Sequence, residues 1–292
     1  MAHASSDEGA ARPYPGRLRI QPTAGLSDDE RQQERTLAGI VQGPSADALY
    51  NEIALTYRGL VVNIDLYREL LPAYRLDPSG SATPEIRLRR TRYTAATFAP
   101  AKAASFDRFQ REAARARQVI ILGGGPTSGK SSALRAIIGK IDRSTATVYD
   151  TSLTDPATAE REISHAIRND RHVQIYWVFK PFAMAIDGMI RRAVAEGRYL
   201  TLQRMVDLHR GSRRTLLHIL ERFAGVHSLN VLAVRNLSGN ISDIPLADLS
   251  TIFQNPEEEI TYERALQRFQ QCEQSLGIPD DLKACLRGPS SR

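Results

Sequence analysis

The sequence is poor in cysteine and has no long hydrophobic run. Cys272 and Cys285 are the only cysteines, which is too few for a disulfide framework, and neither lies among histidines at a metal-binding spacing. No stretch reaches the roughly eighteen apolar residues of a membrane span. The N-terminus is polar and acidic, unlike a signal peptide. These absences predict a cytoplasmic protein without a membrane anchor.

Acidic and basic residues nearly balance, and no tail of one sign stands out. The formal net charge is +6, and the arginines are spread along the chain. Such a balance fits a polyanionic substrate, but it equally fits an ordinary solvated surface. Charge alone therefore does not indicate a nucleic-acid-binding protein.

The most informative stretch is 118–132. An apolar, strand-like run at 118–122 leads into Gly124-x-x-x-x-Gly129-Lys130-Ser131, and a helix-forming segment follows at 133–140. This order of strand, loop and helix is typical of a phosphate-binding loop rather than of a chance glycine-rich turn. The residues predicted to bind ATP here are Gly124, Gly125, Pro126, Thr127, Ser128, Gly129, Lys130, Ser131 and Ser132.

Two of these residues have expected roles of their own. Lys130 would reach the β- and γ-phosphates, and the Ser131 hydroxyl would bind Mg²⁺. The positive end of the following helix adds to the anion site. ATP and Mg²⁺ are therefore the expected ligands.

Five β-type runs alternate with helical sequence, at 60–64, 118–122, 145–149, 172–179 and 228–234. This alternation predicts an α/β fold of the P-loop NTPase or kinase type, with a mostly parallel sheet flanked by helices. Helices are expected at 27–41, 45–59, 65–71, 101–116, 133–140, 155–169, 181–196, 201–209, 211–223 and 257–276. The arginine-rich segment 73–96 is expected to be a loop.

The domain organisation follows from these segments. Residues 1–26 lack apolar periodicity and are expected to be a mobile leader. A kinase domain would span 27–250, with an N-terminal helical extension at 27–58 and a core at 60–235. Residues 251–292 would form a helical tail.

Polar residues stand where two of the expected strands end. Asp65 follows one run, with Arg68 a turn later, and Asp150 and Thr151 follow another. Carboxyl ends of parallel strands face the ligand crevice, so these four residues are candidates for substrate binding. Asp150 is also expected to hold Mg²⁺ with Ser131. Asp65 could equally be an ordinary helix cap.

Arginines gather at the end of the helix expected at 181–196. Arg191 and Arg192 lie in its last turns and Arg198 just beyond. They could interact only with the carbonyl end of the helix, or they could close onto the triphosphate and neutralise its charge.

The downstream half of the sequence resembles the zeta-toxin family of P-loop kinases. The matching pieces are Tyr149-Asp-Thr-Ser-Leu153, the strand 172–179, Met189-Ile-Arg-Arg-Ala-Val194, Gly197-Arg-Tyr-Leu-Thr201 and the helix that ends in His209. The resemblance implies that Arg191 or Arg192, together with Arg198, clamps ATP. Asp65-Leu-Tyr-Arg68, with Pro72 and Tyr74, resembles the family segment whose Asp acts as base on the substrate hydroxyl.

The order of these segments departs from the family pattern. In the family the Asp-x-x-Arg segment follows the phosphate loop, whereas here it precedes it. Two interpretations remain open. Either the sheet is assembled from permuted elements, or the match at Asp65 is fortuitous and Asp150 takes its role.

The resemblance implies a kinase that phosphorylates a hydroxyl of a nucleotide sugar such as UDP-N-acetylglucosamine, with Asp65, Lys130 and Arg198 as catalytic residues and a possible antitoxin as partner. One alternative is a polynucleotide kinase, suggested by the basic balance and the arginines at 87–92, although aromatic residues are not interleaved there. Another alternative is a switch or interaction protein that binds ATP without transferring phosphate.

Overall fold

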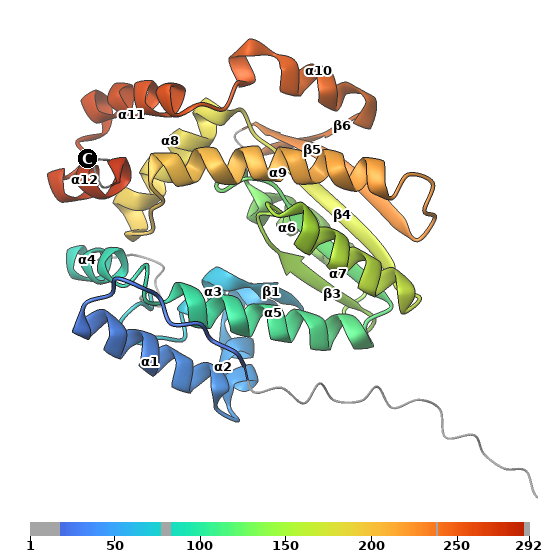
Figure 1. Cartoon of the computed structure of the whole chain (residues 1–292), viewed down its shortest axis with the longest axis horizontal. Coiled ribbons are helices and arrows are strands. Elements are labelled where there is room, and N and C mark those ends of the chain that lie inside the picture. Colours follow the sequence, from blue (N-terminus) through green and yellow to red (C-terminus); the bar gives the residue numbers. More distant parts are fainter. Residues whose placement is uncertain (1–17, 77–82, 238, 289–292) are drawn as a thin grey trace, which may run out of the picture.

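The fold is organised around one mostly parallel β-sheet. The computed structural model describes residues 18–76, 83–237 and 239–288, and within them six strands form a sheet of order β1-β3-β2-β4-β5-β6 (Figure 1). All neighbours are parallel except β5 and β6. The strands are β1 (Val61–Asn63), β2 (Gln118–Gly123), β3 (Ala146–Asp150), β4 (His172–Phe179), β5 (Leu229–Leu237) and β6 (Asn240–Ile244). The α/β class and the parallel sheet predicted from the sequence are confirmed.

The five predicted strands are present, and the sixth was missed. β6 pairs with β5 in an antiparallel hairpin in which Leu237 is opposite Asn240. Asn, Ser, Gly and Pro dominate this part of the sequence, so its short alternation was not recognised as a strand. Only Ile244 at the end of β6 is buried, which leaves little hydrophobic signal for a prediction.

Helices connect the strands and cover both faces of the sheet. They are α1 (Asp28–Gln42), α2 (Ala46–Glu52), α3 (Ile64–Arg68), α4 (Pro84–Arg92), α5 (Phe98–Arg115), α6 (Lys130–Ile137), α7 (Pro156–Arg168), α8 (Phe182–Glu196), α9 (Leu202–Arg222), α10 (Leu249–Gln254), α11 (Tyr262–Leu276) and α12 (Asp280–Arg287). Ser27 caps α1 in the predicted capping box, and Asp155 caps α7 as its Asp-Pro sequence indicates.

The prediction of a loop throughout 73–96 is wrong. Helix α4 occupies its second half, with Thr83 as a cap that accepts a hydrogen bond from the Ile86 amide at 3.3 Å. Pro84 stands in the first turn, where its missing N–H costs no hydrogen bond. The start signal was therefore in the sequence, but the helix has almost no apolar face because most of its residues are charged.

The prediction of two helices at 201–209 and 211–223 is also wrong. A single helix, α9, runs through both segments, with Gly211 in its interior. A Cβ at Gly211 would lie 2.8 Å from the carbonyl oxygen of Thr154. This glycine therefore allows a close approach of the α9 backbone to the connection before α7, and it does not end the helix.

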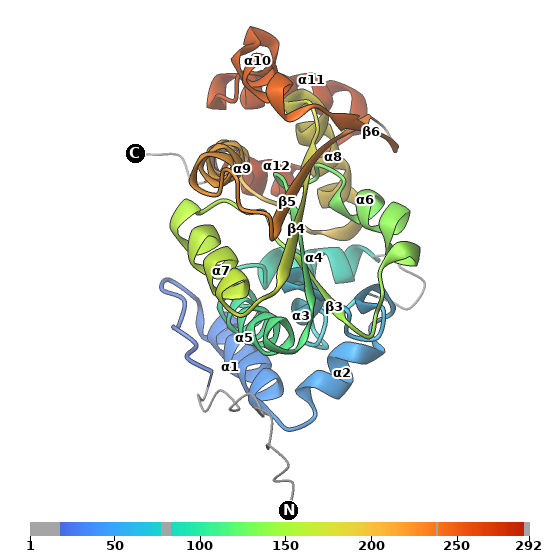
Figure 2. The ribbon, with the colours of Figure 1, turned by 90° about the vertical axis from the view of Figure 1, so that its right-hand side faces the viewer.

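Two hydrophobic layers lie on opposite faces of the sheet. On one face, side chains of β2 and β4 such as Ile121 and Ile175 pack against α5, α7 and α9. On the other face, Ile120 and Leu122 pack against Leu134 of α6. Figure 2, turned to look along the sheet, shows α7 and α9 on one side of the strands and α6 on the other. The sheet is thus held between helices, as parallel sheets require.

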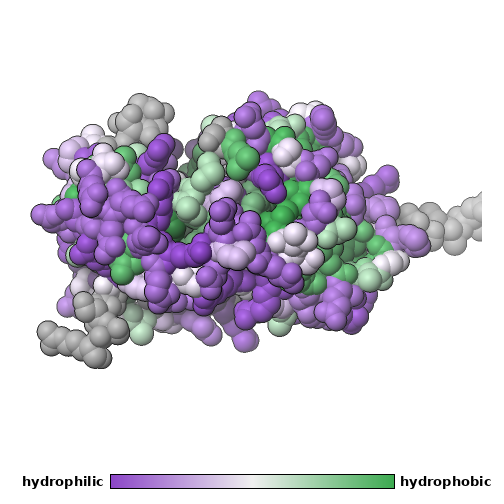
Figure 3. Space-filling view, turned by 90° about the horizontal axis from the view of Figure 1, so that it is seen from above, coloured by the Kyte–Doolittle hydropathy of each residue, from purple (hydrophilic) through white to green (hydrophobic). Residues whose placement is uncertain are grey.

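The C-terminal helices pack against the rest of the fold. Phe269 and Cys272 of α11 and Leu286 of α12 are buried with residues of α8 and of the first half of α9. Figure 3 looks down on the α10 and α11 side, and most of the residues that it shows there are hydrophilic. The segment 260–286 therefore shares a hydrophobic core with α8 and the first half of α9.

The described part of the predicted leader, 18–26, also makes specific contacts. Leu26 is buried, and Leu18 and Ile20 pack against the main core. The Thr23 amide donates a hydrogen bond to the Glu34 carboxylate of α1 at 2.9 Å. Residues 1–17 lie outside the described residues. No helix in the described ranges has the length and apolar character that crossing a bilayer demands.

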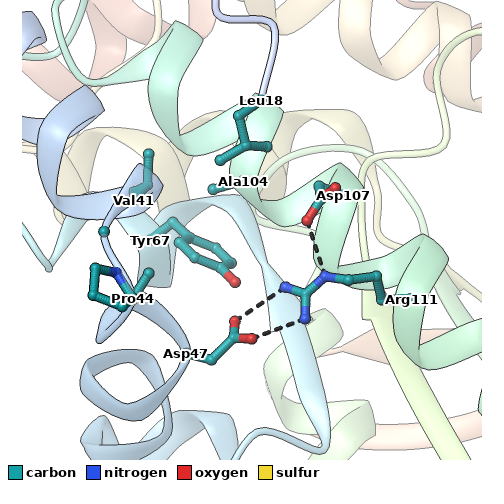
Figure 4. A pocket seen from close by; sticks show the side chains of 10 residues that line it. Leu18, Val41, Pro44, Asp47, Tyr67, Ala104, Asp107 and Arg111 are labelled. Atoms are coloured by element: carbon teal, nitrogen blue, oxygen red, sulfur yellow. Dashed lines mark hydrogen bonds and ion pairs between the residues drawn. The ribbon is translucent and has the colours of Figure 1, made fainter. Parts of the chain in front are cut away.

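A cavity of about 110 Å³ lies between α1, α2 and α5 (Figure 4). Arg111 bridges its walls, since its guanidinium donates to Asp47 at 2.8 and 3.2 Å and to Asp107 at 3.0 Å. Arg108 also pairs with Asp47, at 3.3 Å, so the two carboxylates are matched by two arginines. None of the lining residues comes from the glycine-rich loop or from α8, so the cavity is separate from the candidate site.

Candidate functional site

The carboxyl ends of the three strands β1, β3 and β2 meet in register. Asn63 at the end of β1 lies beside Asp150 at the end of β3, and Asp150 lies beside Leu122 of β2. The glycine-rich loop, residues 124–131, starts directly after β2. Polar groups from separate parts of the sequence therefore converge at this edge of the sheet, where parallel α/β sheets bind ligands.

The glycine-rich loop has a backbone that requires its glycines. Gly124 and Gly129 have φ values of 126° and 95°, and Thr127 has a φ of 56°. A Cβ on Gly124 would collide with the carbonyl oxygen of Val178 in β4. α6 begins at Lys130, so the free N–H groups of its first turn face the end of the loop.

Lys130 lies folded over the loop. Its ammonium group donates hydrogen bonds to the carbonyl oxygens of Gly124 and Gly125, at 3.0 and 3.2 Å. Burial lowers the pKa of Lys130, and the nearby Asp150 carboxylate acts in the opposite direction. The ammonium group of this partly buried lysine therefore lies within the loop, against two of its carbonyls.

Three other elements hold the loop in place. Thr127 donates its hydroxyl to the Ala185 carbonyl of α8 at 2.6 Å. Asn236, at the end of β5, donates its amide to the Gly129 carbonyl at 3.3 Å. His209 of α9 contacts the Pro126 carbonyl at 2.9 Å through Nε2. The loop is thus fixed by contacts to α8, α9 and β5.

His209 supports the loop as a neutral ring. Burial lowers its pKa to about 3, and because a carbonyl only accepts hydrogen bonds, Nε2 carries the proton and donates to Pro126. The ring occupies the space in which a Gly125 side chain would begin. Gly125 therefore lets the loop pack directly against a histidine of α9.

Asp150 is almost fully buried beside Lys130. Its Oδ2 accepts a hydrogen bond from the Asn63 amide at 2.7 Å, whereas Oδ1 is buried without a hydrogen-bond partner among the described residues. Burial raises the pKa of Asp150, while Lys130 and Asn63 lower it. A buried carboxylate oxygen without a partner has a strong tendency to bind a cation or a hydrogen-bond donor.

Asp65 is surrounded by three arginines. It pairs with Arg198, with Arg192 at 3.6 Å and with Arg68 at 3.3 Å. Arg192 and Arg198 come from the end of α8 and the turn after it, and both also contact Glu196. Burial lowers the pKa of Arg198 to about 9, so it stays charged at neutral pH.

Asp65 does not cap α3, contrary to one of the two interpretations from the sequence. The cap is Asn63, whose side-chain oxygen accepts from the Asp65 amide at 2.6 Å. The Asn63 side chain thereby joins the Asp65 backbone to the Asp150 carboxylate. Because Asn63 caps the helix, the Asp65 carboxylate is available to pair with Arg68, Arg192 and Arg198.

Two other predicted arginines, Arg68 and Arg191, have different surroundings. Arg68 is turned into the protein, where it donates to Thr97 at 2.9 Å and to the Thr94 carbonyl at 2.6 Å. Arg191 is exposed, and its positive charge lowers the pKa values of Lys180 and Asp187. The structure therefore brings Arg192, rather than Arg191, to the Asp65 cluster.

The serines and Thr151 lie around the loop and β3. Ser131 is exposed in the first turn of α6, and Ser132 is partly exposed beside it. The Ser128 hydroxyl is buried, with no hydrogen-bond partner among the described residues. Thr151 follows Asp150, and its amide donates to the Leu122 carbonyl at 3.1 Å.

Three residues at strand ends were missed in the sequence: Asn63, Lys180 and Asn236. Each follows or ends a buried run in β1, β4 or β5, so each carried the same signal that identified Asp65 and Asp150. They were overlooked because an Asn or a Lys after a strand is common in loops. Only the sheet order shows that these strand ends lie around one loop.

In the described ranges, no three or more His, Cys, Asp and Glu side chains are grouped so as to hold a metal by themselves. A scan against models of protein families finds no match for this chain, and a search of curated proteins finds no significantly similar relative.

Proposed function

We propose that this protein is an ATP-dependent kinase with a P-loop fold, which transfers the γ-phosphoryl group of ATP to a hydroxyl of a small phosphorylated acceptor. The observation that carries the proposal is the meeting of Lys130, Asp150, Asp65, Arg192 and Arg198 at the carboxyl ends of β1, β2 and β3. These groups come from four separate segments of the chain. Phosphoryl transfer needs this combination of positioned cations and one carboxylate near the acceptor.

The loop supports the nucleotide part of the proposal. Its backbone curls through two glycines of positive φ, and the partly buried Lys130 stands at the start of α6. The phosphates would replace the Gly124 and Gly125 carbonyls as partners of the Lys130 ammonium. An anion would then gain both the lysine and the N–H groups of the first helical turn.

Asp150 and Ser131 fit a Mg²⁺ ion. The buried Oδ1 of Asp150, which has no hydrogen-bond partner among the described residues, is the type of oxygen that Mg²⁺ binds, and Mg²⁺ commonly uses one carboxylate, a hydroxyl and substrate phosphates. Such an ion supplies positive charge to the phosphates. Asn63 orients the carboxylate through its hydrogen bond to Oδ2.

Asp65 is the proposed base for the acceptor hydroxyl. It is partly exposed after the end of β1. Phosphate oxygens would compete with its carboxylate for the guanidinium groups of Arg192 and Arg198. Binding of phosphates would therefore draw positive charge away from Asp65 and leave its carboxylate available to the hydroxyl, with Arg68 holding it in place.

The position of β1 supports the permuted arrangement over a fortuitous match. β1 precedes the loop in sequence, yet it pairs with β3 at one edge of the sheet, so that Asp65 lies on the same side as the loop. Only the order of strands in space matters for such a site. An acceptor of the nucleotide-sugar class, such as UDP-N-acetylglucosamine, is the one that the zeta-toxin resemblance implies.

The arginines at 87–92 give no support to a polynucleotide kinase. Arg90 is fully buried with Glu69, and Arg92 pairs with Asp29 at 3.0 Å. Two of the four arginines of this stretch are thus held by carboxylates of the protein itself, which leaves Arg87 and Arg89 to face a nucleic acid backbone.

The proposal is tested by incubating the protein with ATP, Mg²⁺ and a panel of nucleotide sugars, and by searching for phosphorylated products by mass spectrometry. We expect one sugar to gain a phosphate, with the product lost in Lys130→Ala and reduced at least about a hundredfold in Asp65→Asn. Exposed Arg89→Met serves as the control. Tight ATP binding without any product would instead favour a nucleotide-dependent switch. Full activity in Asp65→Asn would assign the base to another residue.

A further inference from the structure

Lys180 stands at the end of β4, next to the strand that leads into the glycine-rich loop. β4 is the parallel neighbour of β2, so both strands end at the same edge of the sheet. Lys180 is half-buried, and the sequence analysis assigned no role to it. The residue that follows, Pro181, leads directly into α8.

The Lys180 ammonium lies close to the loop. A Cβ on Gly188 of α8 would be 3.3 Å from the Thr127 side chain and 3.9 Å from the Lys180 Nζ. Gly188 therefore marks a point at which the loop, α8 and the lysine meet. The hydrogen bond from Thr127 to the Ala185 carbonyl holds the loop against α8 at this point.

The charge of Lys180 is not neutralised locally. Within the described residues Lys180 forms no ion pair, and the carboxylate that influences it most, Asp187, is held by Arg268 through two hydrogen bonds of 2.6 Å. Arg191, one helical turn after Asp187, adds a second positive charge. Burial and Arg191 lower the pKa of Lys180, and Asp187 acts in the opposite direction.

The two lysines approach the loop from different elements. Lys130 covers the Gly124 and Gly125 carbonyls from the start of α6, whereas Lys180 approaches Thr127 from the β4–α8 connection. A phosphate chain held by the loop would thus have one lysine from each of these elements. A half-buried cation attracts a neighbouring phosphate more strongly than an exposed cation does, because water screens the interaction less.

We propose that Lys180 is a second phosphate-binding lysine, which contacts the phosphates of the bound nucleotide from the α8 side of the loop. This inference rests on the proposed nucleotide site, and it adds a residue to it. Arg191 lies on the same side and would extend the positive charge along α8.

The test is titration calorimetry of the full chain with Mg²⁺ and ATP. We expect Lys180→Met to weaken ATP binding at least about tenfold, the loss of one charge-assisted hydrogen bond. Lys180→Arg keeps the charge and should stay within about threefold of the wild type. Lys102→Met, at an exposed lysine of α5, is the control and should bind as the wild type does.

A second measurement needs no variant. Lysines of the wild-type protein are acetylated with and without saturating ATP, and the modified positions are quantified by mass spectrometry. ATP should protect Lys180 and Lys130 but leave Lys102 unchanged. This readout stays informative even if Lys180→Met fails to fold.

The outcomes separate the two proposals. If the wild type does not bind ATP, the proposed function and this inference both fail. If the wild type binds ATP and Lys130→Ala does not, while Lys180→Met binds normally or Lys180 stays unprotected, only the inference about Lys180 is overturned.

Discussion

Single residues hold the glycine-rich loop against its neighbours, and His209 shows this most clearly. Its ring fills the space beside Gly125 and donates to the Pro126 carbonyl. Protonation would create a charged imidazolium in a buried place where water cannot solvate it. The support of the loop therefore depends on a neutral histidine.

This requirement predicts a pH dependence of stability. The pKa of His209 is about 3 in the fold and close to 6.5 in an unfolded chain, so between these values only the unfolded chain carries the extra proton. Stability should fall as the pH decreases from about 6.5, by at most about 1.4 kcal/mol per pH unit from this group. The measurement is urea unfolding at pH 7 and pH 5.

The matched variant for this measurement is His209→Gln, whose amide can donate to Pro126 but does not titrate. Its stability should vary less between pH 7 and pH 5 than that of the wild type. His165→Gln, at an exposed position of α7, should behave as the wild type does. An identical pH dependence in His209→Gln and the wild type would show that His209 is not the group responsible.

At the scale of elements, α4 connects the N-terminal helices to the turn after α8 that carries Arg198. Thr91 of α4 donates to the Gly197 carbonyl at 3.3 Å, directly before Arg198. A Cβ on Gly197 would collide with the Arg87 carbonyl, so α4 packs tightly on this turn. The helix thereby helps to hold Arg198 against Asp65.

Arg90 is the residue that anchors α4. It is fully buried, donates two hydrogen bonds to Glu69 at 2.8 and 3.0 Å, and stacks 4.5 Å from the ring centre of Tyr74. Arg90→Met should lower the free energy of unfolding by about 3–5 kcal/mol, because it leaves the Glu69 carboxylate buried without its partner.

Denaturant unfolding measures this loss. Arg90→Met combined with Glu69→Leu should recover part of it, since no unpaired charge is then left. The exposed Arg89→Met should change stability by no more than about 0.5 kcal/mol. A loss below about 1 kcal/mol in Arg90→Met would refute the anchoring role.

The elements of the sheet could largely be predicted from the sequence, and α4 could not. Strand 172–179 has one buried face and a continuous apolar run from residue 175 to residue 179, whereas α4 is stabilised by arginines that bond to Glu69 and to Asp29. Hydrophobic periodicity does not detect a helix that is held by buried ion pairs. The continuity of α9 was missed for a different reason, because the sequence analysis placed a helix boundary at Gly211.

At the scale of the whole molecule, α11 and α12 share a hydrophobic core with α8 and α9. Phe269 of α11 is fully buried against residues of α8, and α8 carries Arg192 and the Ala185 carbonyl that binds the loop. Folding of the tail and geometry of the site are therefore linked through α8.

Phe269→Ala should lower the stability of the entire protein by about 3–5 kcal/mol in one cooperative transition. Thermal unfolding followed by circular dichroism measures it. Leu276→Ala, at a position that is 36% exposed, is the control with a small expected effect. A separate low-temperature transition in Phe269→Ala, with the remaining structure unchanged, would instead show that the tail folds independently.

The candidate site could be predicted from the sequence only in part. The loop followed from local order alone, because strand, glycines and helix are contiguous at 118–137. The partners of Asp65 did not follow, because Arg192 and Arg198 lie more than a hundred residues away in sequence and meet it only through the strand order. Asn63 and Lys180 were missed for the same reason.

The central claim is that the glycine-rich loop binds ATP through Lys130. Calorimetric titration of the wild type and Lys130→Ala with ATP and Mg²⁺ tests it most directly. The account predicts binding at one site in the wild type and an affinity at least about thirtyfold weaker in Lys130→Ala, with an unchanged unfolding temperature. Absence of binding in the wild type, or equal affinity in the two proteins, would contradict the account.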